Sequence, residues 1–236
     1  MAPSRAFSQA NSSPYDWVDP FIGTAADGNT FPGATVPFGM IQWSPDTRPD
    51  GWYHYGDKTI SGLSLTHISG AGCPIYGDVP ILPWTREVKE SDDPSQFSSA
   101  YAHEKESAHP GFYEVQFDDG AKAELTVAQR AGIAKFEFPS GTSRIVIFNA
   151  AGSATINAQH RQKDFSTIEI RGKDHLIGTV HSGGFCGSTD ALCPLLRSEV
   201  PEAVLVLGHV DGQGIAGFDI CLGTQSWRVR FVFTGP

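Results

Sequence analysis

The sequence predicts an all-β fold, a large two-sheet antiparallel β-sandwich with few short helices. Short segments in which apolar and polar residues alternate recur along the chain, turn residues separate them, and no segment sustains a helical period. The 236 residues include 26 Gly and 16 Pro, which indicates many turns, and 40% are hydrophobic, which is enough for the core of one such domain.

The first segment, residues 16–84, is rich in Gly, Pro and aromatic residues. Gly and Pro hold the backbone in turns that bulkier residues do not follow, and aromatic rings with polar tips suit a rigid surface that lines a sugar. The flat side chains of this surface are Trp43, Trp52, Tyr53, His54, Tyr55 and Tyr76.

Residues 96–110 are polar and charged, and we expect an exposed loop or short helix there that joins two sheet segments and is the best place for a mobile flap. A hairpin follows. Apolar residues alternate with polar ones over 113–117, the DDG turn at 118–120 reverses the chain, and the alternation returns over 123–127.

Further strands are expected towards the C-terminus. Residues 133–138 should pair with 144–148, and residues 166–170 with 176–181, because a turn sequence separates the members of each pair. Two more stretches have the composition of strands, residues 203–207 and the aromatic run at 227–233.

Charge and composition exclude several classes of function. The formal net charge is −9 and the sequence pI is near 5.3, so no basic face is available for nucleic acid or an anionic membrane surface. The chain has no run of eighteen apolar residues, and its first fifteen residues lack the apolar core of a signal peptide. We therefore expect no nucleic-acid partner and no membrane partner.

The four cysteines form no CxxC pair, so buried reduced thiols are preferred to a zinc or redox site. His67 and Cys73 complete no tetrahedral set, and no metal ligand is predicted in this chain. The tight turn at Gly72 and Cys73 can bring backbone N–H groups towards a ligand, but no Walker lysine follows it. A GxSxG nucleophile elbow is also absent from the sequence.

Several polar side chains of the first segment can bind a sugar. Trp52 can stack on a pyranose ring or pack in the core, and His54 can donate to and accept from hydroxyls. For His67 we prefer a buried histidine satisfied by backbone. Aspartates next to Gly and Pro commonly cap turns, which we prefer for Asp46 and Asp50, whereas both roles stay open for Asp78.

Four sequence blocks carry a family resemblance: VDPFIGT at 18–24, FPGATVPFGMIQWSPDT at 31–47, GWYHY at 51–55 and SLTHISGAGCPIYGDVPILP at 64–83. Weaker blocks follow in the same order up to GTVHSGGFCGS at 178–188. Together they resemble the amino-terminal domain of glycoside hydrolase family 92, the calcium-dependent exo-acting α-mannosidases.

The resemblance implies a β-sandwich that is followed, in the full enzyme, by a helical toroid carrying the calcium ligands, the general acid and the general base. We therefore expect no catalytic residue in this chain, calcium ligands outside it, and α-mannoside glycans and the helical domain as partners. The resemblance also places the cysteine matched by Cys73 near the sugar. The expected substrate-binding residues are Trp52, His54, Gly72, Cys73, Tyr76 and Asp78.

The resulting organisation is a disordered tail over 1–15 and one family 92 sandwich domain over 16–236 that lacks the helical domain. Residues 189–226 are an atypical insertion or a mis-joined coding segment. The expected function is to complete the sugar site of an α-mannosidase, with the isolated chain inactive. Two alternatives stay open, a stand-alone carbohydrate-binding module and a truncated product without independent function. Related enzymes are often secreted or periplasmic, and a cytoplasmic location stays open for this chain.

Overall fold

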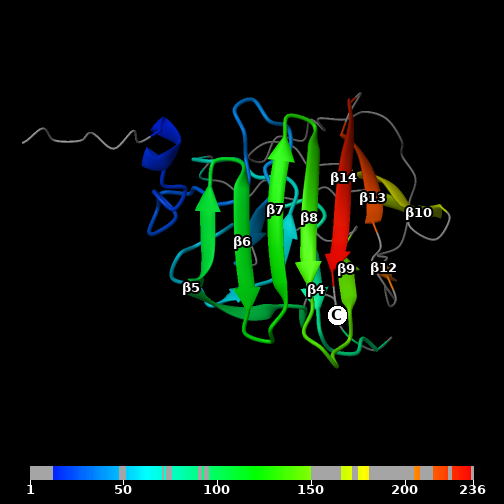
Figure 1. Ribbon diagram of the computed structural model, residues 1–236. Coiled ribbons are helices and arrows are strands. Elements are labelled where there is room, and N and C mark those ends of the chain that lie inside the picture. Colours follow the sequence, from blue (N-terminus) through cyan, green and yellow to red (C-terminus); the bar gives the residue numbers. More distant parts are fainter. Residues whose placement is uncertain are drawn as a thin grey trace, which may run out of the picture.

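The computed structural model describes residues 13–47, 52–70, 72, 76–89, 92 and 96–149, together with the backbone of five later strands between residues 166 and 234. Two β-sheets form the fold (Figure 1). The smaller sheet has the strand order β1-β3-β4-β9-β12, and the larger has the order β10-β11-β13-β14-β8-β7-β6-β5-β2. The predicted all-β sandwich is therefore confirmed.

The smaller sheet contains β1 (Ser44–Asp46), β3 (Gly62–Ser64), β4 (Ile81–Trp84), β9 (Ile145–Phe148) and β12 (Leu205–Leu207). All its pairings are antiparallel. Every residue of β1, β3 and β4 is buried, so both faces of this part of the sheet are covered. Consecutive apolar residues, as in β4, are typical of such a strand.

The larger sheet contains β2 (Thr59–Ile60), β5 (Ser99–His109), β6 (Phe112–Phe117), β7 (Lys122–Ala128), β8 (Ala131–Glu137), β10 (Ser166–Arg171), β11 (His175–Val180), β13 (Ile215–Leu222) and β14 (Gln225–Thr234). Strands β5 to β8 and β14 lie side by side in Figure 1. Two pairings in this sheet are parallel, β8 with β14 and β11 with β13, and the others are antiparallel.

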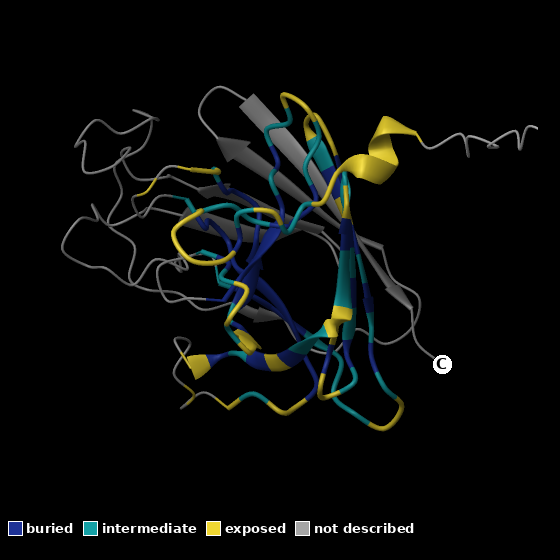
Figure 2. Cartoon of the chain, turned by 90° about the vertical axis from the view of Figure 1, so that its left-hand side faces the viewer, coloured by how far each residue is buried: buried dark blue, intermediate teal, exposed yellow. Residues whose placement is uncertain are grey.

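The β6–β7 hairpin forms as predicted and supplies one wall of the core. All of its inward side chains are buried: Tyr113, Val115, Phe117, Ala123, Leu125 and Val127. Figure 2 shows the exposed residues mainly in loops and at the strand ends. The outward side chains form ion pairs instead, with Lys122 bound to Glu114 and Glu124. A strict period of two thus separates core from solvent.

Later strands are confirmed with one change of pairing. Strands β10 and β11 pair antiparallel, β14 covers the predicted aromatic strand, and β12 lies within residues 203–207. The predicted pairing of 133–138 with 144–148 is wrong. Strand β8 belongs to the larger sheet and β9 to the smaller one, since the chain between them crosses from one sheet to the other.

The prediction for residues 96–110 is also wrong, because most of this segment is strand β5. The register of β5 against β6 shifts between Tyr101 and Glu106, where the pairing is irregular. Such an irregularity breaks the alternation of buried and exposed residues, so the period of two that marks a strand is not visible in the sequence.

The amino-terminal end of the described chain is a short 3₁₀-helix, η1 (Pro14–Trp17), which begins at an N-cap formed by Ser13. No helix in the described part of the chain is long and apolar enough to cross a membrane. Within that part, no group of three or more His, Cys, Asp and Glu residues is arranged to hold a metal ion.

Candidate functional site

Trp52 and His54 lie on one loop that Thr47 holds in place. The Thr47 hydroxyl accepts a hydrogen bond from the His54 N–H at 2.8 Å, and the Trp52 carbonyl accepts one from the Thr47 N–H at 3.1 Å. The Nδ1 atom of His54 accepts from the Gly56 N–H at 3.1 Å, so its Nε2 atom carries the proton. Both predicted side chains are half-buried, which keeps them partly accessible to a ligand.

Asp78 is buried and bound to Thr66 in both directions. The Thr66 hydroxyl donates to Oδ2 of Asp78 at 2.6 Å, and the Asp78 N–H donates to the Thr66 hydroxyl oxygen at 3.0 Å. The backbone around Asp78 is strained, because Tyr76 has φ +65° and Val79 has φ +52°. A β-branched residue rarely adopts this left-handed region, and its energetic cost is about 1–3 kcal/mol.

Gly72 has φ +65°, as expected for a tight turn, and among the described residues no side chain lies within 4 Å of the position of a Cβ atom there. Cys73 lies outside the described residues, as does Asp50. The structure therefore gives positions for five of the six predicted substrate-binding residues, and it leaves their role in binding as a prediction.

His67 is buried, as preferred, and its partners are a backbone carbonyl and a carboxylate. Its Nδ1 atom lies 2.9 Å from the carbonyl oxygen of Gln42 and must carry a proton, because a carbonyl only accepts. Its Nε2 atom lies 2.9 Å from Oδ1 of Asp46. Burial raises the pKa of Asp46, and the neighbouring His67 opposes this shift. Turn capping by Asp46 is thus not observed, since its carboxylate binds Ser64 and His67 within the core.

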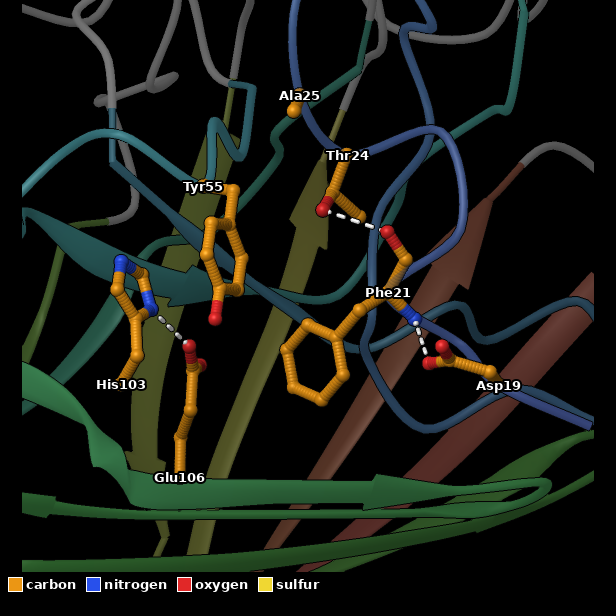
Figure 3. Close-up of a pocket in the computed structure, with 7 residues that line it drawn as sticks. All are labelled: Asp19, Phe21, Thr24, Ala25, Tyr55, His103 and Glu106. Atoms are coloured by element: carbon orange, nitrogen blue, oxygen red, sulfur yellow. Dashed lines mark hydrogen bonds and ion pairs between the residues drawn. The ribbon is translucent and has the colours of Figure 1, made fainter.

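A separate open pocket of about 390 Å³ lies between loop 19–25 and strand β5 (Figure 3). The residues that line it are Asp19, Phe21, Thr24, Ala25, Tyr55, His103 and Glu106. We call this cavity the β5 pocket. None of the six predicted substrate-binding residues lines it, and only Tyr55 belongs to the predicted aromatic surface.

Glu106 forms the floor of the β5 pocket, with a side chain that is only 1% exposed. Its Oε1 atom accepts from the Tyr53 hydroxyl at 2.6 Å and lies 2.5 Å from Nδ1 of His103, and its Oε2 atom accepts from the Tyr113 hydroxyl at 2.7 Å. Burial and then the charge of Glu106 raise the pKa values of Tyr53 and Tyr113 well above the usual range. Both hydroxyls therefore remain donors to the carboxylate.

Aromatic rings form the wall of the β5 pocket. Tyr55 stacks on His103 with ring centroids 4.0 Å apart and planes 9° apart, and Phe21 meets Tyr55 edge-on at 6.1 Å. In Figure 3 the hydroxyl of Tyr55 points towards Glu106, and the ring of Phe21 lies beside that of Tyr55. The two rings and Glu106 thus line the same pocket.

The loop that carries Phe21 is held by its own side chains. Oδ1 of Asp19 accepts from the Phe21 N–H at 2.9 Å, and the Thr24 hydroxyl donates to the Phe21 carbonyl at 2.7 Å. The Tyr55 N–H donates to the Thr24 carbonyl at 2.9 Å, which ties this loop to the loop of Trp52 and His54. The β5 pocket and the predicted sugar-binding loop are therefore neighbours.

Sequence reasoning found part of this pocket only as a motif. Asp19, Phe21 and Thr24 belong to the VDPFIGT block, but nothing in the block shows that they enclose a cavity. His103 and Glu106 were missed because the irregular register of β5 leaves no regular alternation in the segment that carries them. The Tyr53 hydroxyl, whose sequence separation from Glu106 is 53 residues, offers no local signal.

The fold and these sites define a two-sheet β-sandwich domain with pre-formed loops along one pocket. The model of the glycosyl hydrolase family 92 N-terminal domain matches residues 17–193, and the chain belongs to this family. A protein of Arthroderma benhamiae described as an uncharacterized secreted glycosidase is 33% identical over 149 residues, which are 58% of this chain and 19% of that protein.

Two solved structures share the fold. The family GH92 alpha-mannosidase BT3965 from Bacteroides thetaiotaomicron is 34% identical, with a TM-score of 0.63 over 71% of this chain and 24% of that one. The gh92 family glycosyl hydrolase ccman5 is 22% identical, with a TM-score of 0.60 over 71% of this chain and 26% of that one, and supports the fold alone. The chain thus spans about a fifth to a quarter of the length of these relatives.

Proposed function

We propose that this chain is the domain of an α-mannosidase that completes its sugar site, while the remainder of the enzyme hydrolyses terminal α-mannosides of glycans. The observation that carries the proposal is the 34% identity to a family GH92 α-mannosidase over 71% of this chain. The described geometry supports it, because Thr47 and Thr66 hold the candidate residues on pre-formed loops. A pre-formed site loses less entropy when it binds.

In this proposal Trp52 packs against the apolar face of a sugar, and His54 and Asp78 hold hydroxyls or the loops around them. Gly72, Cys73 and Tyr76 shape the same side of the site, where the leaving sugar would lie. Calcium would be held by residues outside this chain, and no step in this domain depends on it. We also propose that the general acid and general base belong to that remainder, so the domain binds and positions a sugar without cleaving it.

Titration of the purified chain with α-mannobiose, followed by tryptophan fluorescence, tests the proposal. We expect weak binding, with a dissociation constant on the order of millimolar, because only one side of the sugar is contacted. Trp52→Ala should abolish binding. The matched control is Trp17→Ala, since Trp17 is 71% exposed and lines neither site.

Two results would contradict the proposal. A folded chain that does not bind α-mannobiose would argue against a sugar-binding role for this domain. Rapid release of mannose from α-mannobiose by the chain alone, with calcium added, would show that the catalytic groups lie in this domain. A dissociation constant well below the millimolar range, with binding lost in Trp52→Ala, would instead favour a stand-alone carbohydrate-binding module.

A further inference from the structure

We propose that the β5 pocket is a second carbohydrate contact of this domain, and that it accepts neutral sugars and rejects anionic ones. The choice of a glycan as the ligand rests on the proposed function. The discrimination between neutral and anionic sugars rests on the pocket itself, and it concerns residues other than the six assigned above.

The polar atoms of the β5 pocket are mainly hydrogen-bond acceptors. Asp19 is exposed, and among the described residues only its Oδ1 atom has a partner, so Oδ2 can accept from a ligand. Both oxygens of Glu106 are already bound and its side chain is buried, so Glu106 contributes negative charge to the floor of the pocket. A ligand that fills this space must therefore donate hydrogen bonds, as sugar hydroxyls do.

The charge of the lining decides which ligands are rejected. The seven lining residues include two carboxylates, Asp19 and Glu106, and no Lys or Arg. A phosphate or carboxylate would lie beside Asp19 without a Lys or Arg partner, and the imidazole of His103 is already bound to Glu106. The like charges would therefore repel. The net charge of −9 adds to this repulsion.

The aromatic wall suits a ring that has both hydroxyls and an apolar face. Phe21 is partly buried and Tyr55 is exposed, so both rings can contact C–H groups of a ligand while its hydroxyls face Asp19. The Tyr55 hydroxyl has no partner among the described residues and can donate to the ligand or accept from it. The volume of about 390 Å³ lies within the usual range for small-molecule sites, about 300–1,000 Å³.

Two-dimensional ¹H–¹⁵N NMR of the whole 236-residue chain tests this inference. The Phe21 amide reports on the β5 pocket, because it donates to Asp19, and the His54 amide reports on the loop of Trp52. Addition of α-mannobiose should shift the Phe21 amide, and mannose 6-phosphate should not. Asp19→Asn keeps an acceptor for that amide but removes the charge, and we expect it to weaken binding at Phe21 about tenfold.

Asp19→Asn should also allow mannose 6-phosphate to shift the Phe21 amide, which a purely structural role of Asp19 would not produce. Tyr55→Phe should weaken α-mannobiose binding at Phe21 without affecting mannose 6-phosphate. Glu104→Gln is the matched control, since Glu104 is an exposed carboxylate on β5 that does not line the pocket. It should change neither titration.

The outcomes separate this inference from the proposed function. Shifts at His54 that Trp52→Ala abolishes, without any shift at Phe21, would overturn the second site and leave the proposed function intact. Shifts at Phe21 that survive in Trp52→Ala would support an independent second site. Equal binding of mannose 6-phosphate and α-mannobiose by the unsubstituted chain would overturn the inferred rejection of anionic sugars.

Discussion

Nε2 of His67 lies 2.9 Å from Oδ1 of Asp46 at a place where both side chains are almost fully buried. Ser64 donates to the other carboxylate oxygen, and the Gln42 carbonyl accepts from Nδ1 of His67. This network joins strands β1 and β3 to His67, which lies near the start of the sequence block that also contains Gly72 and Asp78. It therefore fixes the first residues of that block against the smaller sheet.

Replacing Asp46 with Ala should destabilise the fold without unfolding it. The substitution leaves Nε2 of His67 and the Ser64 hydroxyl buried without a partner, and each unpaired buried group costs about 1–3 kcal/mol. Urea denaturation at pH 7 should show the lower free energy of unfolding. The exposed Glu104→Ala is the control, and a similar small effect of both substitutions would contradict this role of Asp46.

Glu106→Ala should be more damaging, because it removes the acceptor of two tyrosine hydroxyls and of His103. We expect a loss of more than about 2 kcal/mol in the free energy of unfolding, measured by denaturant titration. Glu106→Gln keeps one acceptor oxygen and should recover part of that loss. If the Ala and Gln variants were equally unstable, the loss would not come from the missing acceptor.

The outer face of the larger sheet should give a small acid-dependent contribution to stability. A hydrogen bond from Lys122 is the main cause that lowers the pKa of Glu124 below its usual value of 4.5. A lowered folded-state pKa stabilises the fold above the unfolded-state pKa, and this contribution is lost as the pH falls from about 4.5 through the folded-state value.

Glu124→Gln should therefore lower the melting temperature slightly at pH 7 and have little effect near pH 3. The ion pairs of Glu124 with Lys122 and Lys135 are on the surface, so the effect at pH 7 should be at most about 1 kcal/mol. Melting curves of both proteins between these pH values test the prediction. If the difference in melting temperature between the two proteins grew as the pH fell, the prediction would be contradicted.

Gly33→Ala should prevent normal packing of the core. A Cβ atom at this position would lie 2.2 Å from the Trp43 carbonyl oxygen and 2.3 Å from the Ser44 Cβ atom, so the backbone would have to move. Overpacking of this kind costs about 1–3 kcal/mol or more. A lower melting temperature and altered near-ultraviolet circular dichroism of the tryptophans are expected.

Gly141→Ala is the control substitution for Gly33→Ala. Nothing lies within 4 Å of its Cβ position, but its φ is +78°, so only backbone strain opposes the substitution. We expect a cost of about 1 kcal/mol. If Gly141→Ala were the more damaging of the two, the close approach at Gly33 would not be the dominant constraint.

Part of the fold follows from local pattern alone. The alternation over 113–117 and 123–127 places one set of side chains inward, and a one-residue slip would expose all of them, so the β6–β7 hairpin was predictable. The family motifs also pointed to Trp52, His54 and Asp78. They did not reveal the hydrogen bonds from Thr47 and Thr66 that hold these residues.

The sequence by itself determined the all-β class and the β6–β7 and β10–β11 hairpins, because period-two patterns and turn residues act over a few neighbours. The family followed from the resemblance of its sequence blocks. Only the tertiary structure decided that β8 and β9 enter different sheets, since an apolar strand does not encode its partner. The β5 pocket also forms only in the tertiary structure. Glu106 meets Tyr53 because a loop 53 residues earlier in the chain packs against β5, and it meets His103 within the irregular part of β5. Those contacts form only when segments that are distant in the sequence pack together, and the alternation of residues along one segment does not indicate which other segment it will contact.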